Sequence, residues 1–342
     1  TIGSRDTPNG DGLDFDGCRR VRISGCDIDS GDDSIAPKTF HPDWPNEDFE
    51  ISGCRITTRW HAIRVGCESI GAIRRLAMRD CVFVNCQGGI KIESCEGALF
   101  EDLSFTDIEM RQVCQPFMVL ASRFAFSAHN KTSRPPVGRI RNVRFANIKA
   151  VAGIAEDVGR VRRPDKPAAP DPFERLCSAV VSLPGTSIEG ISFTNVKLAF
   201  PGGGTAEQAA RLDVAELLEG FDYTKWAIPF DGELPASALY LRHVKGVRLE
   251  NVRLAVEQPD ARAFIAGDDV RGLTLRAVNA RAPAPVPGLA KLADAKGVDI
   301  RDCRVECGAA VPVVVAPSTE ELRRLAELRS RLSGKIFSVA VP

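Results

Sequence analysis

The chain has 342 residues, 44% of them hydrophobic, and its 45 basic and 45 acidic side chains cancel to a formal net charge of zero. This balance provides no basic field for nucleic acid and no cationic run for an anionic membrane, so we expect neither as a partner. No apolar stretch approaches the roughly 18 residues that a membrane-spanning helix needs. An acidic substrate stays compatible with the composition, because a cleft needs only a few local cations.

A repeated apolar pattern runs along the chain, with apolar or Cys side chains at the first, third, sixth and eighth positions of each unit. The units begin at Val21, Phe49, Leu76, Leu103, Val143, Ile191, Val247, Leu273 and Val298. The early steps are 28, 27 and 27 residues, the last two are 26 and 25, and those between are longer. Alternating strands repeated at this period predict a solenoid whose coils stack into parallel sheets.

A second set of short strands lies between these units and in phase with them. Its first apolar members are Leu13, Ile35, Ile63, Ile90 and Phe117. Successive side chains of a strand point to opposite faces, so the residues beside these anchors point outward. The sequence therefore predicts one outward row with Asp14, Arg64 and Lys91, and a neighbouring row with Lys38 and Glu93.

The fold class expected from both patterns is all-β: a right-handed, single-stranded parallel β-helix over residues 1–317. Residues 157–176 and 201–236 break the repeat, and we expect both to be insertions that leave the solenoid. Residues 318–342, where leucines at helical spacing follow Ser318, predict a C-terminal helix and strand that cap the stack. The 11 cysteines mostly follow the repeat and are interpreted as small buried hydrophobes, with one or two disulfides left open.

Acidic residues and a histidine come directly before the strands of the second set. They are Asp11, the pair Asp32 and Asp33, and His61. Crowded carboxyls raise at least one pKa, which provides a general acid near neutral pH. An acid and a base about 6.5–9.5 Å apart on either side of a glycosidic oxygen make an inverting glycoside hydrolase. A single Asp at a turn is ordinary, but four such residues in register favour a site.

At these residues the sequence resembles the polygalacturonases, glycoside hydrolase family 28. Residues 9–14 read N-G-D-G-L-D and residues 29–36 read D-S-G-D-D-S-I-A, close to the family patterns N-T-D-G and G-D-D-x-I-A. Residues 60–66 and 89–94 stand where the family has G-H-G-x-x-I-G and R-I-K. The stretch 239–244 resembles the C-terminal coils of bacterial members, whereas the family's N-terminal coils are expected to be missing.

The resemblance implies a role for each matching residue. Asp32 would be the general acid, Asp11 and Asp33 would hold and activate the water, and His61 would tune the acid or bind substrate. Asn9, in the first motif, is expected to bind substrate.

The matching motifs also depart from the family pattern. The family's Arg and Lys, which bind the sugar carboxylate, fall on Lys91 and Glu93, so one charge is reversed. Arg64 lies beside Lys91, and we expect this pair to bind an acidic group; an ordinary exposed ladder charge is the alternative. Trp60 could stack on a sugar ring or pack in the core.

The function expected from the sequence is therefore inverting hydrolysis of a pectic or related uronate-containing polysaccharide. No cofactor or metal is expected, the chain is expected to be a monomer, and the family analogy implies an extracellular or periplasmic location. One alternative is a polysaccharide lyase or epimerase on the same fold, with a calcium site and a Lys or Arg base. Another is a non-catalytic carbohydrate-binding β-helix, in which Lys91 and Glu93 mark lost activity.

Overall fold

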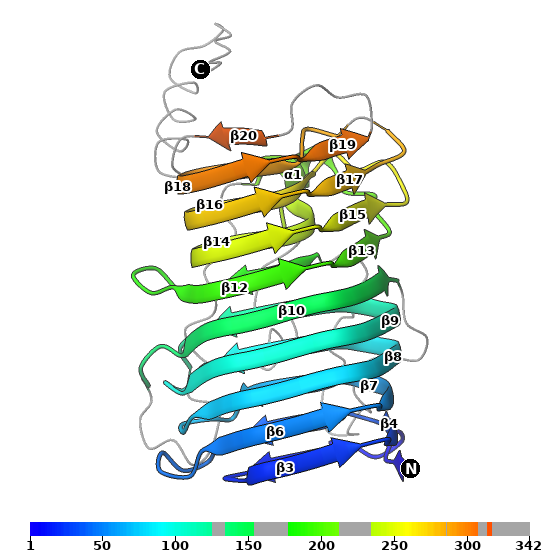
Figure 1. Ribbon diagram of the computed structural model, residues 1–342, viewed down its shortest axis with the longest axis vertical. Helices are drawn as coiled ribbons and strands as arrows, with labels where there is room; N and C mark the ends of the chain where they lie inside the picture. Colours follow the sequence, from blue (N-terminus) through cyan, green and yellow to red (C-terminus); the bar gives the residue numbers. More distant parts are fainter. Residues whose placement is uncertain (125–133, 154–176, 212–233, 285, 307–312, 317–342) are drawn as a thin grey trace, which may run out of the picture.

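The computed structural model of the chain describes residues 1–124, 134–153, 177–211, 234–284, 286–306 and 313–316. Within these ranges the backbone forms β-strands and one short helix, which stack along one axis (Figure 1). The elements in chain order are β1 (Ile2–Gly3), β2 (Leu13–Asp16), β3 (Arg19–Ser24), β4 (Asp27–Ser30), β5 (Ile35–Lys38), β6 (Asn46–Ser52), β7 (Arg55–Cys67), β8 (Ile73–Ser94), β9 (Leu99–Ala121), β10 (Arg139–Ala152), β11 (Ser178–Val181), β12 (Ile188–Thr194), β13 (Lys197–Phe200), α1 (Ala206–Ala210), β14 (Ala236–Glu250), β15 (Arg253–Val256), β16 (Ala263–Arg276), β17 (Asn279–Arg281), β18 (Ala290–Arg301), β19 (Arg304–Glu306) and β20 (Val313–Ala316).

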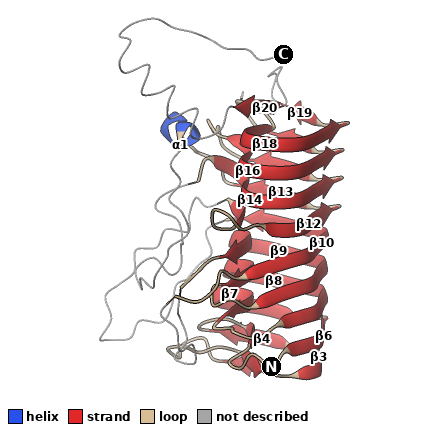
Figure 2. Cartoon of the chain, turned by 90° about the vertical axis from the view of Figure 1, so that its left-hand side faces the viewer, coloured by secondary structure: helices blue, strands red, loops and turns tan. Residues whose placement is uncertain are grey.

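Each coil of the stack has three faces, and the strands of neighbouring coils pair in parallel on each (Figures 1 and 2). Strand β8 passes through all three. We call them face A, which holds Leu76 and Met78, face B, which holds Cys81 and Phe83, and face C, which holds Ile90 and Ile92. The chain is a right-handed parallel β-helix, and the fold class expected from the repeat is confirmed.

The register of the strands follows the apolar repeat coil by coil. On face A, Leu76 pairs with Phe49 on one side and with Leu103 on the other. The longer steps keep the same register, since Leu103 pairs with Val143, which in turn pairs with Ile191. The register of face A is therefore the same across the short and the longer steps.

The core is the column of inward side chains along the axis of the stack. Phe145 lies between Phe105 and Phe193, with ring centroids 5.5 and 4.9 Å away, and all three rings are buried. Fully burying one such ring contributes about 1.5–3 kcal/mol. Because a single coil leaves this inward row exposed, the coils are stable only when stacked.

The outer segments expected from the sequence are only partly described. Within 201–236, α1 begins at the N-cap Thr205, which forms a capping box with Gln208. Lys291 Nζ donates to the carbonyl oxygen of Ala209 at 2.7 Å and ties this helix to β18. The described helix is too short to cross a bilayer.

Two other segments cannot be compared with their expected structure. Residues 157–176, expected to be an insertion, and residues 318–342, expected to cap the stack, lie outside the described residues. No disulfide joins the cysteines that the structure describes.

Candidate active site

The acidic residues meet on face C, in the N-terminal coils. Gly10 O accepts hydrogen bonds from Gly31 N at 3.0 Å and from Asp32 N at 3.2 Å, and Gly12 N donates to Asp33 O at 2.9 Å. These bonds pair the loop around Asp11 with the loop of the next coil. The stacking thus brings together carboxyls that are 21 and 22 positions apart in the sequence.

The glycine after Asp11 is required by the close approach of these loops. A Cβ atom at Gly12 would lie 2.4 Å from the carbonyl oxygen of Ser34. No side chain fits there without moving the backbone, and glycine is the residue that permits such contacts.

Hydroxyl groups fix the second loop from within the stack. Ser30 Oγ and Thr58 Oγ1 donate to the carbonyl oxygen of Asp32 at 2.8 and 2.6 Å, and Asp33 N donates to Asp32 Oδ1 at 3.0 Å. Asp32 and Asp33 are 2% and 3% exposed. The pair is therefore held rigidly, as a preorganised site requires.

The surroundings of Asp11 raise its pKa. Burial, followed by the charges of Asp33 and Asp32, raises its pKa to about 8, against the lowering effect of Lys38. Lys38 Nζ lies 3.3 Å from Asp11 Oδ2 and 3.2 Å from Asp14 Oδ2. The cluster thus keeps a proton at neutral pH. Because coupled carboxyls titrate as a set, this proton belongs to the set.

His61 is bound to the second member of the acidic pair. Its Nδ1 lies 2.8 Å from Asp33 Oδ1. Burial lowers the pKa of His61 to about 3, although Asp33 acts in the opposite direction. The neutral ring therefore donates its Nδ1 proton to the carboxylate and leaves Nε2 as an acceptor. This buried Nε2 has no hydrogen-bond partner among the described residues, so it is available to a water or a sugar hydroxyl.

The expected cation pair lies in one outward row, where Arg64 pairs with Lys91 in register. Both side chains contact Glu93: Arg64 Nη2 lies 2.6 Å and Lys91 Nζ 3.2 Å from its Oε2. Burial opposes ionisation of Glu93, but Lys91 and Arg64 hold its pKa below the usual range. Arg64 Nη1 also lies 3.5 Å from Asp33 Oδ2. Within the described residues, the acidic group that both Arg64 and Lys91 contact is therefore the side chain of Glu93.

The two remaining expected residues differ in their surroundings. Trp60 is 5% exposed and belongs to a hydrophobic cluster outside the core, with Met118 and Tyr240, and its ring lies edge-on to His61. Of the two interpretations of Trp60, packing is the one that its burial favours. Asn9 is exposed at the start of the first loop, with a φ of 52°.

Three residues to which the sequence analysis gave no role also build the site. They are Lys38, Thr58 and Gly88. For Lys38, the available signal was its position in the second predicted outward row, close to the acidic residues. Gly88 pairs with His61 in register, and a Cβ there would lie 2.3 Å from His61 Cδ2. The glycine pair just before Ile90 was the available signal, because a glycine in a strand often marks a close approach.

The chain is thus a parallel β-helix with a cluster of acidic residues on face C of its N-terminal coils. Residues 1–160 match the model described as glycosyl hydrolases family 28. These residues contain every candidate site residue, and the resemblance to the polygalacturonase family is confirmed over this part of the chain.

Curated relatives agree with this family. The chain is 25% identical over 186 residues to a probable polygalacturonase from Vitis vinifera, covering 52% of this chain and 36% of the relative. It is 26% identical over 150 residues to a polygalacturonase from Juniperus ashei, covering 42% and 28%. A polygalacturonase from Medicago sativa is 22% identical over 217 residues, covering 60% and 45%. The matched region spans less than half the length of each of these relatives.

Proposed function

We propose that the chain is an inverting O-glycosyl hydrolase that acts on pectic or related uronate-containing polysaccharide. The observation that carries this proposal is the crowding of Asp11, Asp32 and Asp33, which leaves one proton on the cluster near neutral pH. General acid catalysis needs a carboxyl that is still protonated at the working pH. It also needs an ionised partner, and the contacts of Asp33 with His61 and Arg64 provide one.

In the proposed mechanism, Asp32 donates the shared proton to the leaving glycosidic oxygen. Asp33, aided by Asp11, accepts a proton from the water that attacks the anomeric carbon from the opposite side. The donor ends deprotonated and the base protonated, so transfer of that proton within the cluster resets the site.

His61 has a positioning and binding role in this proposal. Its Nδ1 proton holds Asp33 in place, and its Nε2 accepts a hydrogen bond from the attacking water or a sugar hydroxyl. A neutral histidine is suited to this task, because it adds no positive charge that would lower the acid's pKa.

For the substrate, we propose that Glu93 competes with the sugar carboxylate for Arg64 and Lys91. Two cations and one carboxylate leave one positive charge, and Asp33 lies against it. A neutral or esterified sugar enters this subsite without disturbing the ion pairs, whereas a free uronate has to displace Glu93. We further propose that the chain works as a monomer outside the cytoplasm, where such polymers occur.

The proposed function is tested by the release of reducing ends from a panel of polygalacturonan, rhamnogalacturonan, esterified pectin and neutral glycans. The proposal expects release from at least one pectic polymer and none from the neutral glycans. Product absorbance from an unsaturated sugar, abolished by a chelator, would instead identify a lyase. Binding of a pectic polymer without any bond cleavage would identify a non-catalytic carbohydrate-binding protein.

A further inference from the structure

A row of cations crosses face B in the middle of the stack. Lys149 on β10 pairs in register with Lys197 on β13, and Lys197 pairs with Arg253 on β15. All three side chains are exposed. Adjacent coils are about 4.8 Å apart, so the three charges form a ladder with a short, regular spacing. We call Lys149, Lys197 and Arg253 the cation row.

On face A, carboxylates compensate the ladders of cations. On face A one register first alternates in sign, through Arg19, Glu47, Arg74, Glu101, Arg141, Glu189 and Lys245. It then continues through two more cations, Arg271 and Lys296, and Arg271 lies 2.8 Å from Asp269 and 2.7 Å from Asp294. Ion pairs link many of these neighbours, for example Arg74 with Glu47 at 3.2 Å and Lys245 with Glu189 at 3.6 Å. Opposite charges in register stabilise a sheet and like charges destabilise it.

The cation row lacks this compensation. The nearest carboxylate to Lys149 is Glu109 at 3.9 Å, and Glu109 already accepts two hydrogen bonds from Arg111, at 3.0 and 2.7 Å. Lys197 and Arg253 form no ion pair with any residue that the structure describes. Three like charges in register destabilise a sheet, and the cation row lacks the carboxylates that offset the cations of face A. We therefore expect an external anion to balance it.

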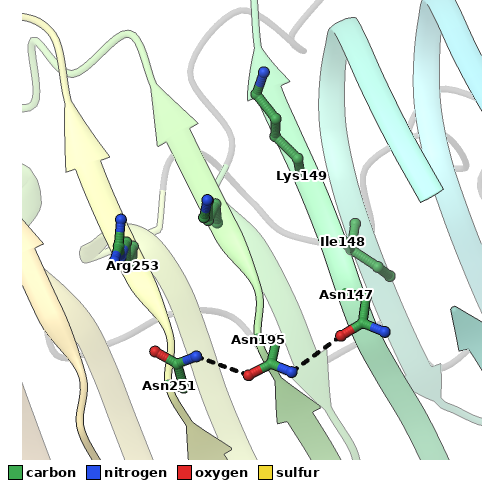
Figure 3. Close-up of a pocket in the computed structure, with 7 residues that line it drawn as sticks. Asn147, Ile148, Lys149, Asn195, Asn251 and Arg253 are labelled. Carbon is green, nitrogen blue, oxygen red and sulfur yellow. Dashed lines mark hydrogen bonds between the residues drawn. The ribbon is translucent and has the colours of Figure 1, made fainter. Parts of the chain in front are cut away.

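The surroundings of the cation row form a groove (Figure 3). One wall is a ladder of amides: Asn251 Nδ2 donates to Asn195 Oδ1 at 2.7 Å, and Asn195 Nδ2 donates to Asn147 Oδ1 at 3.0 Å. These asparagines lie at the bend between faces A and B, each with a φ of 52–55°. Hydrogen bonding between the amides fixes the wall and leaves it polar.

The other side of the cation row is small and apolar. Val151, Ala199 and Ala255 occupy the next outward position of the same strands, and Val151 pairs with Ala199, which pairs with Ala255. Val151 is 39% exposed. The groove thus offers amides for hydroxyl groups and a line of cations for carboxylates. The apolar row beside it offers a low shelf for the C–H face of a sugar ring.

We propose that the cation row, with the amide ladder on one side and the apolar row on the other, forms an anchoring site for a linear polyuronate chain, separate from the acid cluster. Such a polymer carries one carboxylate on each sugar, at a repeat of the same order as the coil spacing. The site lies on face B, whereas the acids lie on face C of more N-terminal coils, so one sugar cannot contact both. The choice of polyuronate rests on the proposed function; the site itself rests on the uncompensated charges.

The experiment compares two double variants of equal charge change. In Lys197→Gln/Arg253→Gln, two members of the cation row are neutralised. In Arg144→Gln/Arg248→Gln, two exposed cations of face A are neutralised, each of which pairs in register with Ser or Thr neighbours and not with another cation. Affinity for polygalacturonate is measured by gel retardation at low and physiological salt. The first variant is expected to bind about tenfold more weakly, and the control to bind like the unmodified protein.

Two further measurements make the outcome decisive. Hydrolysis of a short oligogalacturonide, too short to reach both sites, is expected to be unchanged in the first variant. Equal polygalacturonate affinity in both variants would overturn the proposal, as would an equal loss of affinity for dextran sulfate, which would indicate general polyanion binding. Gel retardation reports binding and does not depend on bond cleavage. It therefore tests the cation row even if the protein hydrolyses none of the polymers.

Discussion

Replacement of Gly88 by Ala would place a methyl group against the ring of His61. The added Cβ would lie 2.3 Å from His61 Cδ2 and 3.2 Å from His61 Nε2. Ordinary carbon contacts begin near 3.5 Å, so the ring has to move by about 1 Å. It is fully buried, and its Nδ1 makes a 2.8 Å hydrogen bond to Asp33. A shift of that size breaks the bond or tilts it out of alignment.

The expected cost follows from that displacement. A misplacement of about 1 Å in a catalytic constellation lowers the rate roughly 100-fold. We expect kcat on the best pectic polymer to fall by about this factor with little change in KM. Overpacking should also reduce the free energy of unfolding by about 1–3 kcal/mol. Steady-state kinetics and urea denaturation, done on the same preparation, separate the two effects.

The matched control is Gly3→Ala, because an added Cβ at Gly3 has no atom within 4 Å. A second comparison is with His61→Ala, which should remove the same function. The double variant Gly88→Ala/His61→Ala should then be no slower than His61→Ala alone. A folded Gly88→Ala protein with unchanged kcat would refute the reasoning that His61 must keep its position over Gly88.

Three other substitutions probe the charges of the site. The folded state holds the Asp11 proton up to about pH 8 and the unfolded state releases it near pH 4, so stability falls as pH rises through this window. Asp11→Asn should remove that slope, matching the unmodified protein at pH 4 and exceeding it at pH 8 in chemical denaturation. Lys38→Met removes the cation that lowers the Asp11 pKa, and should move the alkaline limb of the pH–activity profile upward; an unmoved limb contradicts the assignment. Glu93→Gln leaves Arg64 and Lys91 buried without their carboxylate, so unfolding should become easier by about 3–5 kcal/mol. The kcat/KM ratio of polygalacturonan to esterified pectin should rise in that variant, and a constant ratio would show that Glu93 does not compete with uronate.

The sequence predicted the parts of the structure that depend only on the period of the apolar repeat. A step of 27 residues from Phe49 to Leu76 places two buried side chains in register, and the pairing of these strands confirms it. The same phase brings Asp11 next to Asp32 and Asp33, since loops before stacked strands share one edge of the sheet. The longer steps did not disturb this prediction, because the strands before and after them still pair in register.

Features that depend on side-chain conformation were not predictable in the same way. Pattern placed Arg64 beside Lys91, but it could not show that Glu93, from the next outward row, reaches both cations. Nor could spacing tell which carboxyl has the raised pKa, because that depends on burial and on the position of Lys38. The contact of Gly88 with His61 needs the local approach of two strands, which no periodicity encodes.

The central claim is that stacked coils assemble one acid–base site from Asp11, Asp32 and Asp33. Its most direct test is reducing-end release from the best pectic polymer by Asp32→Asn, with Asp27→Asn, an exposed carboxyl of face B, as the control. We predict that Asp32→Asn abolishes release while Asp27→Asn retains it, and that product from the unmodified protein has the inverted anomeric configuration by NMR. Undiminished release by a folded Asp32→Asn protein would contradict the account.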